Sequence, residues 1–148
     1  MRKYSGSIDV LSDNQVIVIG TNPIGVNGSL KTGKGGAALF ALKKGWISQG
    51  EKMNNCLSKS GKAWGLVTVT GPGKKKSKTP DEIKSNILKL YEFATKNPDK
   101  EFLIAYTGIE NYNLNGYSNK ELAQMFSWFE IPSNIIFESE FSTLLDVE

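Results

Sequence analysis

The sequence predicts an α/β domain in which helices cover both faces of a mostly parallel, mixed sheet. Short β-branched or apolar runs alternate with segments in which apolar residues recur at helical spacing. Two of those segments begin with a helix-capping motif, and Gly and Pro separate the successive elements. The order strand, helix, strand, helix, strand favours βαβ crossovers, and 148 residues are the length of one domain.

Five runs are interpreted as strands. Residues 16–19 read Val-Ile-Val-Ile, apolar on both faces, which is typical of a buried parallel strand. Residues 7–11 are expected to pair before it as an edge strand. The runs 63–70, 102–106 and 135–137 are rich in β-branched and aromatic residues and predict the remaining strands.

Three segments are interpreted as helices. Residues 37–44 are rich in Ala and Leu and precede a glycine, which predicts a short helix. Thr79 and Glu82 form a capping box with proline at the first helical position, and Ser118 and Glu121 form a second one. Apolar residues follow both boxes at helical spacing, so each box predicts a helix with one buried face.

Composition excludes several kinds of site. The chain has no histidine and one cysteine, Cys56, which excludes an intramolecular disulfide and a structural zinc site. We expect neither a metal nor a resident cofactor. No apolar stretch is long enough to cross a bilayer and no secretory leader is recognisable, so the expected location is the cytoplasm. Trp64 and Trp128 are expected in the core.

Three polar loops follow the predicted parallel strands, at residues 20–36, 70–78 and 107–117. Ligands of open α/β sheets bind beyond the carboxyl ends of the strands, where these loops gather. Residues 20–36 contain six glycines and precede a helix, which favours a phosphate cradle of backbone N–H groups. The candidate ligand-binding residues are Gly20, Thr21, Asn22, Asn27, Gly33, Lys34, Gly35, Gly36, Thr107, Gly108, Ile109, Glu110 and Asn111.

These loops contain two further patterns. The sequence of residues 28–35 nearly matches the nucleotide-binding P-loop motif. However, Gly35 replaces the Ser or Thr whose hydroxyl would hold magnesium, which disfavours a nucleoside triphosphatase. In the last loop, Tyr112 or Tyr117 is expected either to lie against a sugar or base or to be a half-buried surface residue.

The chain resembles a macrodomain-like family, particularly small bacterial and phage proteins. The resemblance lies in a buried strand entering Gly20-Thr21-Asn22, the run at residues 33–38, then Gly45, Gln49-Gly50 and Thr107-Gly108-Ile109. It implies a three-layer α/β/α sandwich that binds ADP-ribose or a related NAD-derived nucleotide, linear or cyclic. Asn22 would then face the distal ribose, and Gly108 and Ile109 would hold the second phosphate.

Two alternatives remain open at this point. An ADP-ribosyl hydrolase would use a water held by Asn22 or Asn27 and activated by Glu51 or Glu110. A nucleic-acid or partner-binding protein would use the lysines at residues 74–78, together with an exposed tryptophan. For a phage protein, the first interpretation extends to sequestration of an NAD-derived signal in the host cytoplasm.

Overall fold

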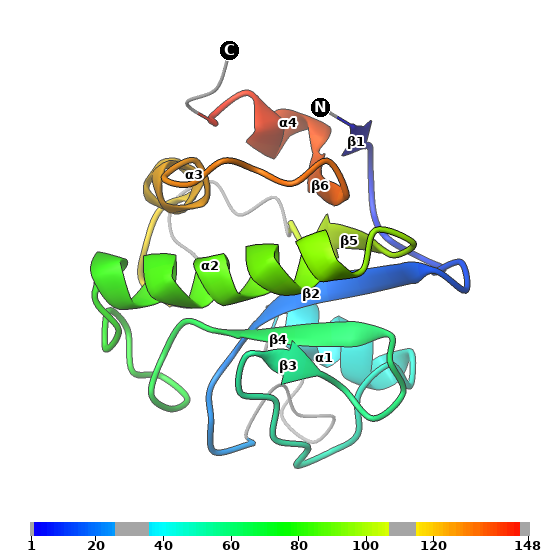
Figure 1. The fold of residues 1–148 in the computed structure, drawn as a ribbon. Coiled ribbons are helices and arrows are strands. Elements are labelled where there is room, and N and C mark those ends of the chain that lie inside the picture. Colours follow the sequence, from blue (N-terminus) through cyan, green and yellow to red (C-terminus); the bar gives the residue numbers. More distant parts are fainter. Residues whose placement is uncertain (1, 26–35, 107–114, 146–148) are drawn as a thin grey trace.

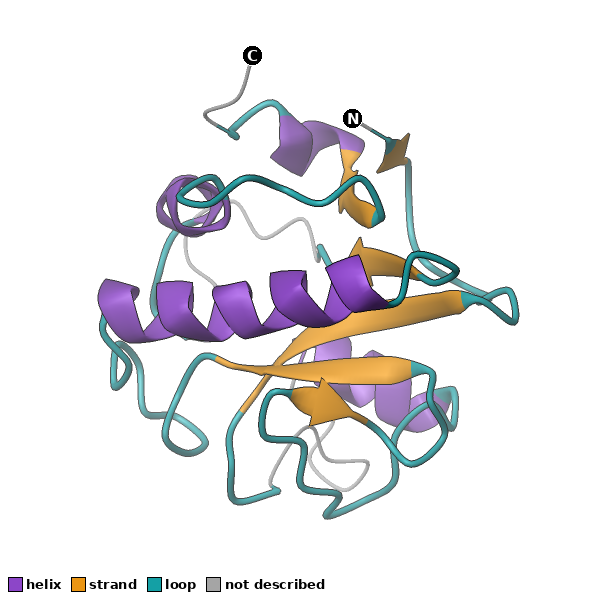
Figure 2. Cartoon of the chain, viewed as in Figure 1, coloured by secondary structure: helices purple, strands orange, loops and turns teal. Residues whose placement is uncertain are grey.

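The computed structural model describes residues 2–25, 36–106 and 115–145 (Figure 1). Within these residues the chain forms one sheet of six strands and four helices (Figure 2). The strands are β1 (Lys3–Tyr4), β2 (Gln15–Thr21), β3 (Cys56–Leu57), β4 (Ala63–Val67), β5 (Glu101–Ile104) and β6 (Ile135–Glu138). The helices are α1 (Gly36–Lys43), α2 (Pro80–Lys96), α3 (Asn119–Phe126) and α4 (Ser139–Ser142). The expected α/β class is confirmed.

The sheet has the strand order β1-β6-β5-β2-β4-β3. Its neighbouring strands run parallel, except that β3 pairs antiparallel with β4 at one edge. Strand β2 lies between β4 and β5, with Ile17 beside Ala63 on one side and beside Leu103 on the other. Because both of its backbone edges are paired, β2 is buried along most of its length, as its apolar sequence predicts.

The two faces of the sheet have separate cores. Alternate residues of a strand point to opposite faces, so Val16 and Val18 join apolar side chains of α2, α3 and α4. Ile17 and Ile19 face the other way and join those of α1. Figure 1 shows the same arrangement, with α2 in front of β2 and β4 and α1 behind them. Helices therefore contact both faces of the sheet.

Both expected capping boxes are present and fix where α2 and α3 begin. Thr79 Oγ1 accepts the Glu82 N–H at 3.2 Å, and Ser118 Oγ accepts the Glu121 N–H at 3.1 Å. In each box the glutamate carboxylate accepts the N–H of the cap residue in return. Each exchange satisfies two N–H groups that have no partner inside the helix, so these two boundaries follow from local sequence.

Two strand predictions need correction. Residues 7–11 form no strand, because β4 and β5 already occupy both edges of β2 and leave no place beside it. Strand β4 ends at Val67, three residues earlier than expected. The Val67 carbonyl accepts a hydrogen bond from the buried amide of Asn86 in α2 at 2.9 Å, so the carboxyl end of the strand, paired with β2 through Thr21, is also tied to the helix.

Polar side chains connect distant parts of the chain at the other end of α2. Asn134 Nδ2 lies 2.9 Å from the Ala94 carbonyl, 3.1 Å from that of Asn97 and 3.0 Å from that of Lys100. One buried amide therefore holds the C-terminus of α2 and the turn into β5 against the start of β6. Tyr91 adds a second tie, since its hydroxyl donates to the Phe126 carbonyl of α3 at 2.6 Å.

The first strand is held by the last part of the chain. Tyr4 in β1 pairs with Glu138, its hydroxyl donates to the Ile104 carbonyl at 2.6 Å, and its own carbonyl accepts from Ser139 Oγ. Burial raises the pKa of the Tyr4 hydroxyl, and the neighbouring Glu138 carboxylate raises it further. The hydroxyl therefore stays protonated as a hydrogen-bond donor to β5.

Candidate functional site

The carboxyl ends of β2, β4 and β5 lie at the same edge of the sheet, because these three strands run parallel. From β2 the chain continues to α1 on one face, whereas from β5 it continues to α3 on the other. Neighbouring parallel strands whose connections depart to opposite faces form a topological switch point, where α/β proteins have a crevice for ligands. The connections that leave β2 and β5 contain two of the three loops that sequence analysis selected.

Two polar residues at the end of β2, Thr21 and Asn22, are buried and hydrogen-bonded. Thr21 is 2% exposed, and its hydroxyl donates to the Met53 carbonyl at 3.1 Å. Asn22 is 4% exposed, and its side-chain oxygen accepts the Ile24 N–H at 3.2 Å, which closes an Asx turn. Gly20 is exposed, and a Cβ there would lie 3.1 Å from Thr68 Oγ1. The chain therefore leaves β2 at the switch point with Asn22, whose side-chain amide is buried and has a fixed direction.

Two glycines of the loop predicted to cradle a phosphate have positive φ. Gly25 has φ +84° and lies so close to Gly50 that an added Cβ would come within 2.7 Å of the Gly50 carbonyl oxygen. Gly36 has φ +55° and is the first residue of α1. Both backbone conformations are readily adopted by glycine, which explains two of the six glycines in this loop.

Most predicted ligand-binding residues lie outside the part of the chain that the structure describes. Residues 26–35 and 107–114 belong to the two loops that follow β2 and β5. The predicted residues in these segments are Asn27, Gly33, Lys34, Gly35, Thr107, Gly108, Ile109, Glu110 and Asn111. The P-loop-like stretch and Tyr112 also lie there. Of the predicted set, Gly20, Thr21 and Asn22 are described at the end of β2, and Gly36 is described at the start of α1.

Beyond the second of these segments, Tyr117 is anchored from several sides. It is 5% exposed, and its hydroxyl donates to the Lys78 carbonyl at 2.7 Å. Its N–H donates to the side-chain oxygen of Asn115, another buried residue. Burial raises the pKa of Tyr117, and the carboxylates of Glu121 and Glu82 add to the shift. Tyr117 is thus part of the framework of this edge and is more buried than the half-buried residue expected.

The lysine-rich segment at residues 74–78, here called the lysine loop, lies against the same edge. The Lys76 N–H donates to the Asn115 carbonyl at 2.7 Å, and its ammonium lies 5.5 Å from the centre of the Tyr117 ring. Gly116 allows this approach, since a Cβ there would lie 2.9 Å from Lys75 Cβ. The sequence placed residues 70–78 at the same edge as the loops that follow β2 and β5. The bond between Lys76 and Asn115 fixes the lysine loop beside residues 115–117.

Of the two carboxylates considered for catalysis, Glu51 has a structural role. Glu51 Oε1 accepts the Ser48 N–H at 2.9 Å, and its Oε2 accepts the Lys59 N–H at 2.7 Å. Both oxygens of Glu51 therefore hold backbone turns, which disfavours it as a base that activates water. Glu110 lies outside the described residues. Among the described residues, no group of three or more Cys, Asp or Glu side chains is arranged to hold a metal ion.

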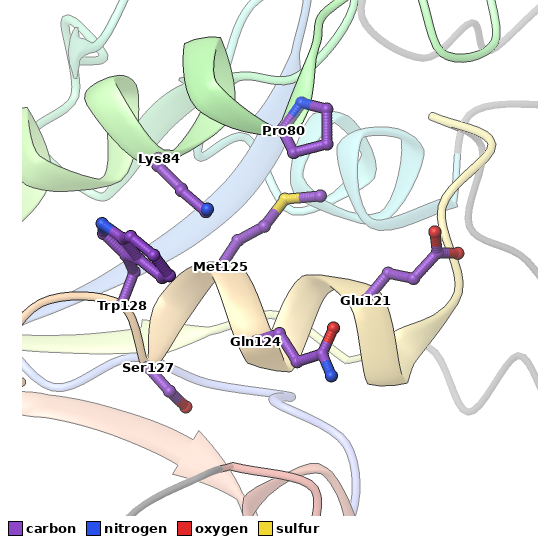
Figure 3. A pocket seen from close by; sticks show the side chains of 7 residues that line it. All are labelled: Pro80, Lys84, Glu121, Gln124, Met125, Ser127 and Trp128. Atoms are coloured by element: carbon purple, nitrogen blue, oxygen red, sulfur yellow. The ribbon is translucent and has the colours of Figure 1, made fainter.

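A groove of about 390 Å³ lies between α2 and α3, on the face opposite α1 (Figure 3). Its lining residues are Pro80, Lys84, Glu121, Gln124, Met125, Ser127 and Trp128. Figure 3 shows Trp128 and Glu121 at opposite ends of the groove, with Met125 between them. The prediction that Trp128 belongs to the core is wrong, because α3 ends at Phe126 and the Trp128 side chain stays 66% exposed. Trp64, by contrast, is buried as expected.

Taken together, the fold and this edge define an α/β domain with a topological switch point between two parallel strands, β2 and β5. No protein-family model matches the chain, and no curated protein or solved structure matches it either. None of the helices in the described ranges is both long and apolar enough to cross a bilayer.

Proposed function

We propose that the chain is a three-layer α/β/α sandwich of macrodomain-like type that binds an ADP-ribose-type or related NAD-derived nucleotide. The observation that carries this proposal is the pair β2 and β5, which are adjacent and parallel but continue to opposite faces. Loops that leave such a pair border one crevice. These two loops are the ones in which the sequence has its glycine-rich and Thr-Gly-Ile segments.

A diphosphate is the chemistry that suits the loop after β2. This loop ends where α1 begins, and the first turn of a helix, with the positive end of its dipole, favours an anion. Gly33, Lys34 and Gly35 directly precede that helix in sequence. Glycine lets the backbone approach a phosphate closely, and the lysine adds one positive charge.

The ribose part of the ligand is assigned to Asn22. Its Asx turn fixes the direction of the amide, and burial limits competition from bulk water. An oriented amide of this kind can both donate to and accept from sugar hydroxyls. In the family that the sequence resembles, an asparagine at this position faces the distal ribose.

Binding without cleavage is the favoured activity. The hydrolase alternative requires a carboxylate that activates water, and of its two candidates Glu51 already accepts two backbone hydrogen bonds, while Glu110 lies outside the described residues. Binding without turnover is also what sequestration of a signalling nucleotide would require.

Isothermal titration with ADP-ribose, NAD and cyclic ADP-ribose tests the proposal. We expect one of them to bind with one-to-one stoichiometry, and Asn22→Ala to weaken that binding about tenfold through loss of hydrogen bonds worth roughly 1.4 kcal/mol. Asn14→Ala is the matched control, because Asn14 directly precedes β2 at its amino end. Failure of all three ligands to bind, or equal losses in the two variants, would refute the proposal. Release of ADP-ribose from modified protein would identify a hydrolase instead.

A further inference from the structure

The groove between α2 and α3 presents an aromatic surface with a cation beside it. Four large hydrophobic side chains are exposed in the described part of the chain, and Trp128 is the aromatic one among them. The Lys84 ammonium lies 3.6 Å from the centre of the Trp128 ring, and Asp81 lies 3.8 Å from the same ammonium. A single exposed tryptophan is unremarkable, but Trp128 borders a groove and stays 66% exposed although Lys84 covers one face of its ring, so it still offers a surface for stacking.

The opposite end of this groove leads to the lysine loop. Pro80 and Glu121 line that end, and Lys78 lies 3.7 Å from Glu82 in the first turn of α2. Lys74 and Lys75 are exposed, and the backbone of the loop is held by the bond between Lys76 and Asn115. The ammonium groups are therefore presented by a fixed backbone.

The single acidic residue among those that line the groove, Glu121, stays ionised. Its Oε1 accepts the Ser118 N–H at 2.9 Å in the capping box of α3. Its pKa is lowered mainly by the Ser118 backbone hydrogen bond, and the nearby Lys76 lowers it further, so its negative charge lies close to Lys76. The positive charge that a ligand can reach therefore comes from the exposed Lys74 and Lys75.

We propose that the groove between α2 and α3 binds single-stranded nucleic acid, with phosphates at the lysine loop and a base stacked on Trp128. The groove joins the two features, since Pro80 and Glu121 line its end toward the lysine loop and Trp128 lies at its other end (Figure 3). An aromatic platform combined with exposed lysines suits a flexible polyanion with planar bases better than an acidic peptide, which lacks such bases.

Fluorescence anisotropy with a short fluorescein-labelled oligothymidylate tests this second function. Trp128→Ala is expected to weaken binding about fivefold or more, because one base–aromatic stack is lost. Lys74→Glu with Lys75→Glu is expected to flatten the dependence of log K on log salt by about 1.4, since each phosphate contact contributes about 0.7 on a single strand. Trp128 lies outside both cores, so its replacement is expected to leave the fold intact.

The control carries the same change of charge on the other face of the sheet. Lys43→Glu with Lys44→Glu alters the end of α1 and is expected to leave the salt dependence within experimental error of the wild type. Circular dichroism checks that each variant is folded, and Lys74→Ala with Lys75→Ala replaces the charge-reversal variant if it is not.

Three results would overturn the proposal. They are absence of oligonucleotide binding at low salt, equal affinity of the wild type and Trp128→Ala, and competition by base-free polyphosphate as effective per phosphate as the oligonucleotide. Calorimetry with ADP-ribose separates the two functions, because Trp128→Ala is expected to leave nucleotide binding unchanged. A protein that fails to bind the oligonucleotide would therefore leave the proposed nucleotide site untouched. Failure to bind ADP-ribose would likewise leave the proposed nucleic-acid site untouched.

Discussion

Replacing Gly65 by alanine is expected to destabilise the protein and to disturb the end of β2. Gly65 lies in β4, where an added Cβ would overlap Met53 Cβ and come within 2.9 Å of the Met53 carbonyl oxygen and 3.0 Å of Thr21 Oγ1. Met53 is completely buried and Thr21 nearly so. Since two of the three obstacles are main chain or Cβ, no rotamer change relieves the overlap, and the backbone near Met53 has to move away from β4.

The cost of this substitution has two parts. Forcing extra atoms into a filled interior costs about 1–3 kcal/mol. Moving Met53 also weakens the hydrogen bond between its carbonyl and Thr21, which contributes about 1 kcal/mol. The free energy of unfolding is therefore expected to fall by about 2–4 kcal/mol in sum. Urea denaturation, followed by circular dichroism and tryptophan fluorescence, measures this change.

Gly71→Ala is the matched control for Gly65→Ala. A Cβ at Gly71 meets side-chain atoms of Ile24 and Lys74 at 3.7 Å, an ordinary contact. The control is expected to change stability by less than about 0.5 kcal/mol, because the added methyl group meets no atom closer than an ordinary contact. Equal stabilities of the two variants would refute the reasoning. Because Thr21 directly precedes Asn22, Gly65→Ala is also expected to weaken nucleotide binding.

Three other predictions concern side chains that join distant segments. Asn134→Ala is expected to cost about 2–3 kcal/mol in urea denaturation, because three backbone carbonyls lose a buried donor; a stability within 0.5 kcal/mol of wild type, the ordinary surface value, would contradict this. Tyr91→Phe is expected to cost about 1–2 kcal/mol through the lost bond to the Phe126 carbonyl. Burial also raises the pKa of Tyr91, so above about pH 10 the unfolded chain ionises first and stability falls as pH rises, a contribution that the variant lacks. Hydrogen bonds from Gln15 and Arg2 lower the pKa of Glu101, so its contribution is present above the unfolded value of about 4.3 and is lost as pH falls through the folded one. Glu101→Gln is therefore expected to flatten the acid side of the stability curve measured by thermal unfolding, and an unchanged slope would count against it.

Local signals explain the elements that could be predicted from the sequence. The starts of α2 and α3 depend on pairs only three residues apart, Thr79 with Glu82 and Ser118 with Glu121, so the capping boxes could be recognised without tertiary structure. Strand β2 was recognisable because a strand buried on both faces is apolar throughout.

The missed elements depend on contacts that the local sequence does not show. Strand β1 exists through pairing with β6, more than 130 positions along the chain, and β3 exists through two residues paired with β4. Helix α4 begins at Ser139 and is capped by Glu138, whose carboxylate accepts two N–H groups, and glutamate is not among the usual N-cap residues. The exposure of Trp128 depends on where α3 ends, which no glycine or proline marks.

The candidate site could be predicted only as a place in the topology. The order of elements predicted that the ends of β2, β4 and β5 would meet, and their parallel pairing confirms it. The part that the sequence could not show is the attachment of the lysine loop to residues 115–117, because it depends on the Lys76 N–H and on the missing side chain of Gly116.

The pairing of β1 with β6 has a consequence for the order in which the protein folds during synthesis. Strands β2, β4 and β5 are complete once Ile104 has been added, so the centre of the sheet can assemble from the first part of the nascent chain. Strand β1 (Lys3–Tyr4) is synthesised before the other five strands of this sheet, but its partner strand exists only when residues 135–138 have been translated. Among these six strands, the one that is made first therefore cannot pair until the one that is made last is present.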